Sequence, residues 1–214
     1  ITYYKNIELV ITEENSKAVN NDLEIDATKF NYNKSKNIIN AKGNVKIHNK
    51  KENYFIYSDS ATYLKNEEKF FTKNNSKAIN EGITIFADNF LYNKKTNVLK
   101  KNRNEKIDDK VENYKIFAED VTYQKNQDLI FTKGETESII QSEYIFNSSD
   151  VVLDRNLKNL KSNNYSTLKD NNSNFYKASS FTYFYENKFL KAKNLEVISN
   201  LDNSKKDQFY YDSA

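Results

Sequence analysis

The stretch IDATKFNYNKSKNIINAKGNVKI, residues 25–47, decides the fold, because a recognisable copy follows about 60 positions later. The copy reads IFADNFLYNKKTNVLKKNRNEKI and spans residues 85–107. The residues that recur at equivalent positions are Ala27, Phe30, Tyr32, Asn33, Lys34, Asn37, Asn44, Lys46 and Ile47. A chain that repeats a segment in this way builds one structural unit several times.

The repetition extends over most of the chain. ITYYKNIELVITEENSKAV at residues 1–19 aligns without gaps to residues 61–79, and IYSDSATYLKNEEKFFTK at 56–73 aligns to residues 116–133. A weaker copy of the second segment lies at residues 176–190. Successive units begin 31 or 29 residues apart, at positions 25, 56, 85, 116, 145 and 176. The basic unit is therefore about 30 residues long, and alternate units are the most alike.

Each unit reads as a β-hairpin. Its first run follows the pattern apolar-x-Ala-acid-x-apolar-x-Tyr, and its second run is clearest at residues 38–47, where apolar and polar residues alternate with a period of two. Ile39, Ala41, Gly43, Val45 and Ile47 share one face of that run. Polar turns rich in Asn separate the two runs, namely NKSKN at 33–37, KNEE at 65–68, NKKTN at 93–97 and KNQD at 125–128. The pattern predicts an all-β fold.

The first run of each unit changes its inward parity. Ile85 and Ala87 share one parity, whereas Phe90 and Tyr92 share the other. A strand covered on both faces would explain this change, but a β-bulge that switches the inward face explains it better. Acidic residues recur at this point of the units: Asp59, Asp88 and Glu119. A buried unpaired carboxylate would be costly, so we expect these residues to mark the bulge.

The composition excludes several classes of protein. The chain has no Cys, Met, Trp or Pro and only three Gly, and Arg occurs only at positions 103 and 155. A net charge of +3 is nearly balanced, which argues against a dedicated nucleic-acid partner. No apolar run approaches the roughly 18 residues that a membrane-spanning helix requires.

No pattern in the sequence indicates catalysis or a cofactor. The single histidine, His48, ends an amphipathic run beside Asn49 and Lys50 and is interpreted as a surface residue. The three glycines are isolated, so no phosphate-binding glycine loop is present, and no thiol or histidine cluster is available for zinc. The mixed-charge run KKNRNEKIDDK at 100–110 is interpreted as a solvated loop. We therefore expect a protein that is not an enzyme.

These residues resemble a known family. AKGNVKI at 41–47 after a turn rich in Tyr and Asn, together with the recurring first-run pattern, is similar to the OstA-type repeats of the lipopolysaccharide transport proteins LptA, LptC and LptD. The segment SSDVVLDRNLKNLKSNN at 148–164 resembles the later part of the amino-terminal periplasmic domain of the LptD group, which is the most similar branch. Many LptD proteins carry cysteines that flank this domain, and their absence here is a departure from that pattern.

The resemblance implies a β-jellyroll of two facing, twisted antiparallel sheets built from the hairpin repeats, with hairpins alternating between the sheets. It implies a periplasmic lipid conduit, in a domain of a cell outer-membrane protein, that passes lipopolysaccharide toward an outer-membrane β-barrel. The implied partners are the acyl chains of lipid A and other transport proteins that dock by edge-strand addition, namely an LptA-like bridge and an LptE-like lipoprotein that accompanies the full-length barrel.

An apolar seam along stacked hairpins suits acyl chains, because burial of methylene groups makes no directional demand. The residues expected to line such a groove are Phe30, Tyr32, Ile39, Val45, Phe71, Phe90, Tyr92, Val121, Tyr123 and Phe131. Each of them has an equally reasonable interpretation as ordinary sandwich core.

Two alternatives stay open on the sequence alone. One is an LptA-like periplasmic bridge, because the same repeat builds both proteins. The other is a structural solenoid or adhesin-like repeat with a closed core and no lipid, although the 31/29 alternation favours paired hairpins over a solenoid of constant coil length. The alignment of residue 1 to residue 61 and the run QFYYDSA at 208–214 suggest one domain over residues 1–214 that is cut within a repeat at both ends.

Overall fold

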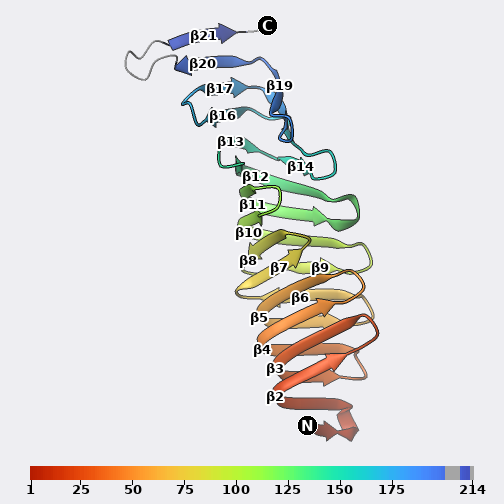
Figure 1. Cartoon of the computed structure of the whole chain (residues 1–214). Coiled ribbons are helices and arrows are strands. Elements are labelled where there is room, and N and C mark those ends of the chain that lie inside the picture. Colours follow the sequence, from red (N-terminus) through yellow and green to blue (C-terminus); the bar gives the residue numbers. More distant parts are fainter. Residues whose placement is uncertain (201–207, 213–214) are drawn as a thin grey trace. The chain divides into compact units, whose positions relative to one another are not determined.

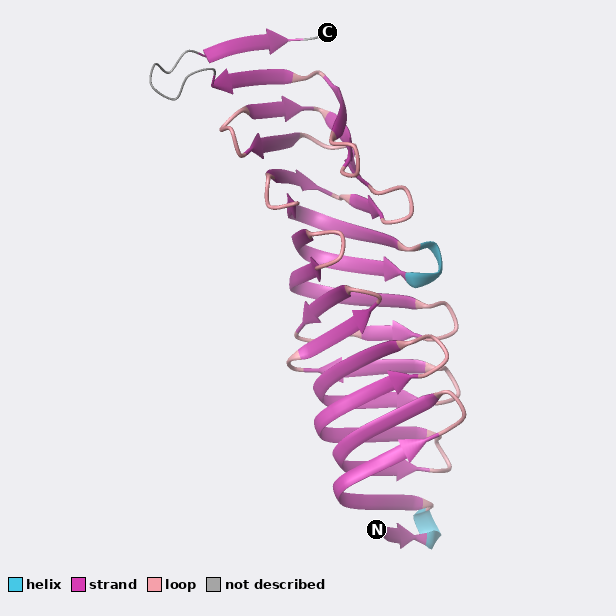
Figure 2. Cartoon of the chain, in the orientation of Figure 1, coloured by secondary structure: helices cyan, strands magenta, loops and turns pink. Residues whose placement is uncertain are grey.

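The computed structural model of the chain describes residues 1–200 and 208–212, and for residues 101–105, 200 and 208–212 it describes the backbone only. The chain divides into two compact units, Ile1–Arg103 and Asn104–Ala214, and each is described by itself. The predicted all-β class is confirmed: apart from two 3-10 turns, Lys5–Ile7 and Lys125–Gln127, the regular structure is β-strand (Figures 1 and 2). The expectation of one domain through both units stays a prediction.

The strands of unit 1 form an antiparallel meander in which long strands are joined by short polar turns (Figure 1). Its strands are β1 (Thr2–Tyr4), β2 (Leu9–Val19), β3 (Leu23–Asn33), β4 (Ile38–Asn49), β5 (Tyr54–Leu64), β6 (Lys69–Lys73), β7 (Ser76–Asn80), β8 (Ile83–Ala87) and β9 (Leu91–Asn93). Strand β10 (Val98–Asp109) begins in this unit, where residues 98–100 pair with β9.

Each long strand of unit 1 bends at a corner near its middle, and the two halves enter different layers. The pairing register shifts at Glu13/Ser16 in β2, at Asp26/Lys29 in β3 and at Lys42/Val45 in β4. The strand that follows β5 is interrupted altogether. Its two parts, β6 and β7, are separated by residues 74–75 and pair with opposite halves of β5. These corners generate two layers from one meander.

The two layers of unit 1 can be named from these pairings. Layer A comprises residues 9–13, 29–33, 38–42 and 60–64 with β6 and β9, and layer B comprises residues 16–19, 23–26, 45–49 and 54–58 with β7 and β8. The layers face each other across a shared interior, because the ring of Tyr54 in layer B lies 5.0 Å from that of Tyr92 in layer A.

Unit 2 repeats this plan. Its further strands are β11 (Tyr114–Gln124), β12 (Leu129–Ile140), β13 (Tyr144–Ser149), β14 (Val152–Asp154), β15 (Asn159–Ser162), β16 (Ser166–Asp170), β17 (Phe175–Ala178), β18 (Ser180–Phe184), β19 (Phe189–Lys193), β20 (Glu196–Asn200) and β21 (Gln208–Asp212). Strand β11 shifts register at Ala118/Asp120, and β12 pairs with β13 through one half and with β14 through the other. Phe146 of β13 and Phe181 of β18 stack across the interior, with ring centroids 5.0 Å apart.

Left-handed backbone conformations occur at the corners of some strands but not of β3, β5 or β11. Gly43 and Asn44 have φ of 77° and 48° in β4, and Asn74 and Asn75 have φ of 60° and 49° between β6 and β7. Two consecutive residues with positive φ bend the strand sharply. Gly and Asn adopt this conformation at the lowest cost. The alternation of apolar and polar residues at 38–47 hides this corner. Ala41 before the corner and Val45 after it are both buried, so the inward parity is the same on both sides.

The 60-residue spacing of the sequence places a threonine at every fourth strand, in β2, β6 and β12, if the interrupted pairs β6/β7 and β8/β9 each count as one strand. The hydroxyl oxygens of Thr12, Thr72 and Thr132 each accept a hydrogen bond from a backbone amide at the corner of the neighbouring strand. The donors are Phe30, Phe90 and Val151, at N···O distances of 3.2, 2.8 and 2.9 Å. These bonds satisfy amides that the bend takes out of the strand ladder.

The bulge expected from the parity change of the first runs is confirmed. Ile85 and Phe90 both point inward and are buried, and the strand is broken between them at residues 88–90. The recurring acids lie at the corners as expected: Asp59 accepts a hydrogen bond from Asn75, Asp88 follows β8, and Glu119 occupies the register shift of β11.

Two other expectations were wrong. Hairpins do not alternate between sheets, because each long strand contributes one half to each layer. The run at residues 100–110 is not a loop but belongs mainly to strand β10, and the side chains of residues 101–105 lie outside the described part of the chain. The mixed charges suggested solvent exposure, which one face of a strand provides as well as a loop does.

Gly43→Ala should destabilise the chain by about 1–3 kcal/mol, because an alanine at φ of 77° is strained. Its Cβ would also lie 2.6 Å from the hydroxyl oxygen of Thr28. Urea unfolding should recover part of the loss in Gly43→Ala/Thr28→Ala, measured against Thr28→Ala alone. Lys42→Ala, on the adjacent exposed position, should change stability by no more than about 0.5 kcal/mol. Equal midpoints for Gly43→Ala and the wild type would contradict this account of the corner.

Candidate lipid-binding interior

The inner faces of the two layers form an apolar interior in each unit. In unit 1 the cross-strand register places Tyr32, Ile39, Tyr63, Phe70 and Tyr92 in one continuous row across layer A. Tyr63 and Phe70 stack with centroids 4.1 Å apart and planes 6° from parallel. The row is thus an aromatic and aliphatic lining with few hydrogen-bonding groups along its length.

Eight of the ten residues expected to line a groove lie on the inner face of one unit or the other. Phe30, Val45, Phe90 and Tyr92 are buried on the inner face of unit 1, and Tyr32 and Ile39 are half-buried there. Val121 and Tyr123 are buried in unit 2.

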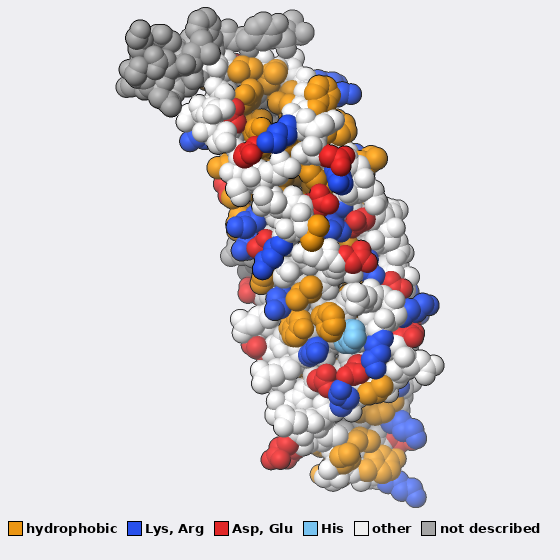
Figure 3. All heavy atoms as spheres, in the orientation of Figure 1, with side chains coloured by type: hydrophobic (Ala, Val, Ile, Leu, Met, Phe, Trp, Pro, Cys, Tyr) orange, Lys and Arg blue, Asp and Glu red, His pale blue; other side chains and the backbone are white. Residues whose placement is uncertain are grey.

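The other two residues lie on the outer face. Phe71 is 39% exposed and Phe131 is half-exposed, whereas their neighbours Phe70 and Ile130 are fully buried. Because successive residues of a strand point to opposite faces, a run of adjacent apolar residues cannot assign the inner one without knowledge of the corner. Outside, charged side chains of both signs are interspersed over the surface (Figure 3).

Tyrosine hydroxyl groups mark the rim of layer A where it meets the turns. Tyr32 donates to Asn37 at 3.2 Å and Tyr92 donates to Asn97 at 2.6 Å in unit 1, and in unit 2 Tyr123 donates to Asp128 at 2.9 Å. Each acceptor ends its turn in the left-handed conformation, with φ of 51–53°. The rings thereby cover the interior while the hydroxyl groups stay at the polar edge.

The interior of unit 1 opens at one cavity of about 60 Å³. Its lining is mainly apolar and comes from both layers: Ala18, Val19, Asn20, Leu23, Ile25, Ile39, Tyr63 and Lys65. Val19 is 61% exposed, so the cavity communicates with solvent. Sequence reasoning identified only Ile39 of this set.

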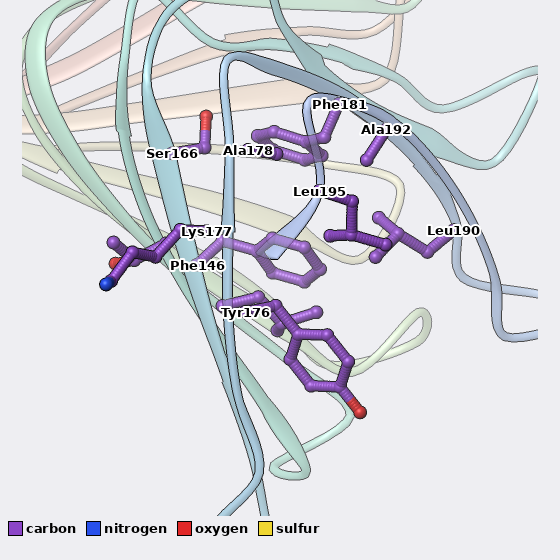
Figure 4. Close-up of a pocket in the computed structure, with 11 residues that line it drawn as sticks. Phe146, Ser166, Tyr176, Lys177, Ala178, Phe181, Leu190, Ala192 and Leu195 are labelled. Atoms are coloured by element: carbon purple, nitrogen blue, oxygen red, sulfur yellow. The ribbon is translucent and has the colours of Figure 1, made fainter. Parts of the chain in front are cut away.

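Unit 2 has a wider hollow of about 650 Å³ and, beside it, a small pocket between its layers, and Phe181, Leu190 and Leu195 line both. The small pocket has a volume of about 10 Å³, roughly the space that one water molecule needs. Figure 4 shows the apolar side chains that close it, among them Phe146, Phe181, Leu190 and Leu195. An elongated ligand would enter here only if these side chains moved.

A buried ion cluster joins the two layers of unit 2 at their edges. The Arg155 guanidinium, which follows β14, contacts Asp109 Oδ2 at 3.0 Å and Asp128 Oδ1 at 2.6 Å. The Asp109 side chain is fully buried, and that of Arg155 is 9% exposed. Asp109 Oδ1 also accepts hydrogen bonds from the amides of Val111 and Glu112, both at 2.9 Å.

Further polar contacts cross the same mouth of unit 2. Gln141 Nε2 donates to the carbonyl oxygen of Tyr185 at 3.1 Å, and Lys188 Nζ lies 2.6 Å from Glu143. Together with the Arg155 cluster, these contacts hold the layer edges of unit 2 closed.

The described residues offer neither a metal site nor a membrane-spanning helix. Within residues 1–200 and 208–212 no three His, Asp or Glu side chains gather as metal ligands. In the same part of the chain, no helix combines the length and the apolar character needed to cross a bilayer.

The two-layered β-fold with aromatic and aliphatic inner faces places the chain in the class of β-jellyroll proteins with an apolar interior. A family model described as lipopolysaccharide-assembly, LptC-related, matches residues 1–104, so this segment of the chain is similar to that family. The resemblance to OstA-type lipopolysaccharide transport proteins is thereby confirmed, and the narrower assignment to LptD is not. No curated protein matches the chain.

The family is one of transport and binding proteins, associated with the periplasm and with lipopolysaccharide. Its match covers the unit that contains the open cavity.

Arg155→Met should destabilise the chain by about 3–5 kcal/mol, because it leaves the carboxylate of Asp109 buried without its partner. Asp109→Asn/Arg155→Met should recover part of this loss in urea unfolding. Lys158→Met, which removes an ion pair with Glu186 that is largely exposed, should shift stability by about 0–1 kcal/mol. If Arg155→Met and Lys158→Met had the same unfolding midpoint, the cluster would have no structural role.

The fold should unfold cooperatively in alkali. Burial raises the pKa of Tyr54 to about 12, and it also raises the pKa of Tyr114, Tyr183 and Tyr185. Their neutral forms stabilise the folded state fully below the unfolded pKa of about 10, and this stability is lost as pH rises through the folded values.

Tyrosinate absorbance should therefore rise in the same transition in which the far-ultraviolet β-sheet signal disappears. Tyr54→Phe should move that transition to higher pH, whereas Tyr165→Phe, at a position 64% exposed, should not. Gradual ionisation of all tyrosines with the fold intact would disprove the burial account.

Proposed function

We propose that this chain is a non-enzymatic conduit for lipopolysaccharide, in which lipid A acyl chains lie between the two layers. The observation that carries the proposal is the continuous inner row from Tyr32 and Ile39 through Tyr63 and Phe70 to Tyr92. The family of residues 1–104 supports the choice of cargo. The proposed contact residues are Phe30, Tyr32, Ile39, Val45, Phe90, Tyr92, Val121 and Tyr123.

The chemistry of the row suits a cargo that has to move. Each buried methylene group contributes roughly 0.8 kcal/mol without requiring a particular orientation. A lining that repeats similar side chains at intervals of one strand offers neighbouring positions of similar affinity. An acyl chain can then pass from strand to strand without leaving a deep binding minimum.

Cargo binding requires the inner side chains to separate. Phe70 and Ile47 are fully buried, so acyl chains would replace contacts between the layers. Because a methylene–side-chain contact resembles the contact that it replaces, the exchange is close to balanced in free energy. The open cavity beside Ile39 is the natural place for such an exchange to begin.

The position of the chain in a transport assembly is part of the proposal. A periplasmic location and docking to other lipopolysaccharide transport proteins by strand addition at a sheet edge agree with the family of residues 1–104. A bridge role of the LptA or LptC kind follows most directly from that family. An LptD-like role next to an outer-membrane barrel is the further proposal that the segment at 148–164 suggests.

The close packing of the interior favours one alternative, a structural β-repeat protein that binds no lipid. In that case the aromatic row would be sandwich core alone. The two functions differ in whether an inner side chain ever touches lipid.

Site-specific photo-crosslinking separates them. A benzoyl-phenylalanine residue at Tyr92 faces the interior, whereas one at Phe71, on the neighbouring strand β6, faces outward and is a matched aromatic control. The conduit predicts that lipopolysaccharide is captured at Tyr92, and likewise at Phe90 and Val45, with little capture at Phe71 or the exposed Lys42. Equal capture at all positions, or capture only at Phe71 and Lys42, would contradict the conduit.

A further inference from the structure

One lysine in unit 1 stands beside the open cavity. Lys65 begins the turn between β5 and β6 and is half-buried against the cavity wall formed by Ile39 and Tyr63. Its ammonium nitrogen donates to the Tyr32 hydroxyl at 3.3 Å and lies 5.1 Å from the centre of the Tyr32 ring. Its backbone amide donates to the carbonyl oxygen of Asn37 at 3.0 Å, which fixes the turn.

In two other turns, the basic residue at the equivalent place pairs with the carboxylate that ends the preceding turn of the same layer. Lys94 lies 3.8 Å from Glu68 in unit 1, and Arg155 lies 2.6 Å from Asp128 in unit 2. In each pair the acid is the last, left-handed residue of its turn. An ion pair between successive turns of one layer therefore occurs in both units.

Lys65 lacks that partner because the preceding turn ends in Asn37, which is neutral. The acids of its own turn are engaged elsewhere, since Glu67 pairs with Lys69 at 2.7 Å and Glu68 with Lys94. Among the described residues, no carboxylate forms an ion pair with Lys65. A half-buried ammonium group with two donor positions left over thus faces the mouth of an apolar cavity.

We propose that Lys65 and the cavity form a head-group site for an anionic amphiphile, whose alkyl chain enters between Leu23, Ile25 and Ile39 while its phosphate or carboxylate binds Lys65. The anionic group of the amphiphile accepts a charge-assisted hydrogen bond from the ammonium group and takes the place of the carboxylate that Asn37 does not provide. This inference rests on the proposed function, because it gives the conduit a place where the charged end of the cargo is held.

The site predicts a preference by head group. Dodecyl phosphate, at concentrations where it is monomeric, should bind the full chain about tenfold more tightly than dodecyl maltoside. Inorganic phosphate alone should not bind measurably, because a single half-buried cation gives little affinity for an anion that carries no alkyl chain. Isothermal titration calorimetry measures all three.

Two variants test the role of Lys65 differently. Lys65→Met should remove the preference for dodecyl phosphate and leave the affinity for dodecyl maltoside within about twofold. Asn37→Asp keeps the lysine but supplies the carboxylate found in the other turns, so it should weaken dodecyl phosphate binding to a similar extent. The matched controls are Lys34→Met, which removes an exposed turn lysine outside the cavity, and Asn66→Asp, which adds an exposed charge beside Lys65; both should leave the preference intact.

The outcomes separate the two proposals. If neither amphiphile binds the wild-type chain, the conduit itself fails. If both bind but Lys65→Met retains the preference, or Asn66→Asp removes it as fully as Asn37→Asp, the conduit stands and the head-group site is wrong. If inorganic phosphate binds as tightly as dodecyl phosphate and only through Lys65, the site takes a free anion and the amphiphile proposal is overturned.

Discussion

The corner in the middle of each long strand is the constraint on which the architecture of both units depends. An unbroken strand of 11 or 12 residues would present one face of one sheet. A corner, which in β4 is formed by the left-handed residues Gly43 and Asn44, bends the strand so that its two halves enclose the same interior. Every local strand pair then contributes to both layers, and the core forms between residues that are close in sequence. Strand pairing and layer packing are therefore specified together.

The turns add an electrostatic pattern to this geometry. At three turns of layer A, the residue that ends the turn is left-handed and its side chain accepts a hydrogen bond from a tyrosine five residues earlier. Two acidic turn ends, Glu68 and Asp128, also form an ion pair with a basic residue of the next turn. In unit 2 the chain extends this pair into the interior through Asp109, which closes the layer edges. In unit 1 the neutral Asn37 leaves the edge beside Lys65 without an ion pair, and the cavity lies there.

The sequence predicted what depends on local pattern. Repeat length, strand–turn–strand order and the bulge at Asp88 follow from periodicity and from turn residues, and the structure agrees. The inner face could be predicted only where a parity change was visible. Phe71 and Phe131 were misplaced because each has an apolar neighbour on the other face. The Gly43–Asn44 corner left no parity change, so it was read as straight strand. Arg155 and Asp109 are 46 positions apart, and the cavity joins Lys65 to residues as distant as Ala18; no local pattern encodes such contacts.

The threonine at every fourth strand has a consequence for how such a chain can change in length. Thr12, Thr72 and Thr132 accept amides from corners that are otherwise built differently from those of the intervening strands. Gain or loss of about 30 residues would set a threonine corner against a neighbour that offers it no amide. Gain or loss of about 60 residues would leave each threonine beside a corner amide that it can accept from. The stack is therefore modular in steps of four strands, and a longer or shorter relative should differ by whole steps of that size.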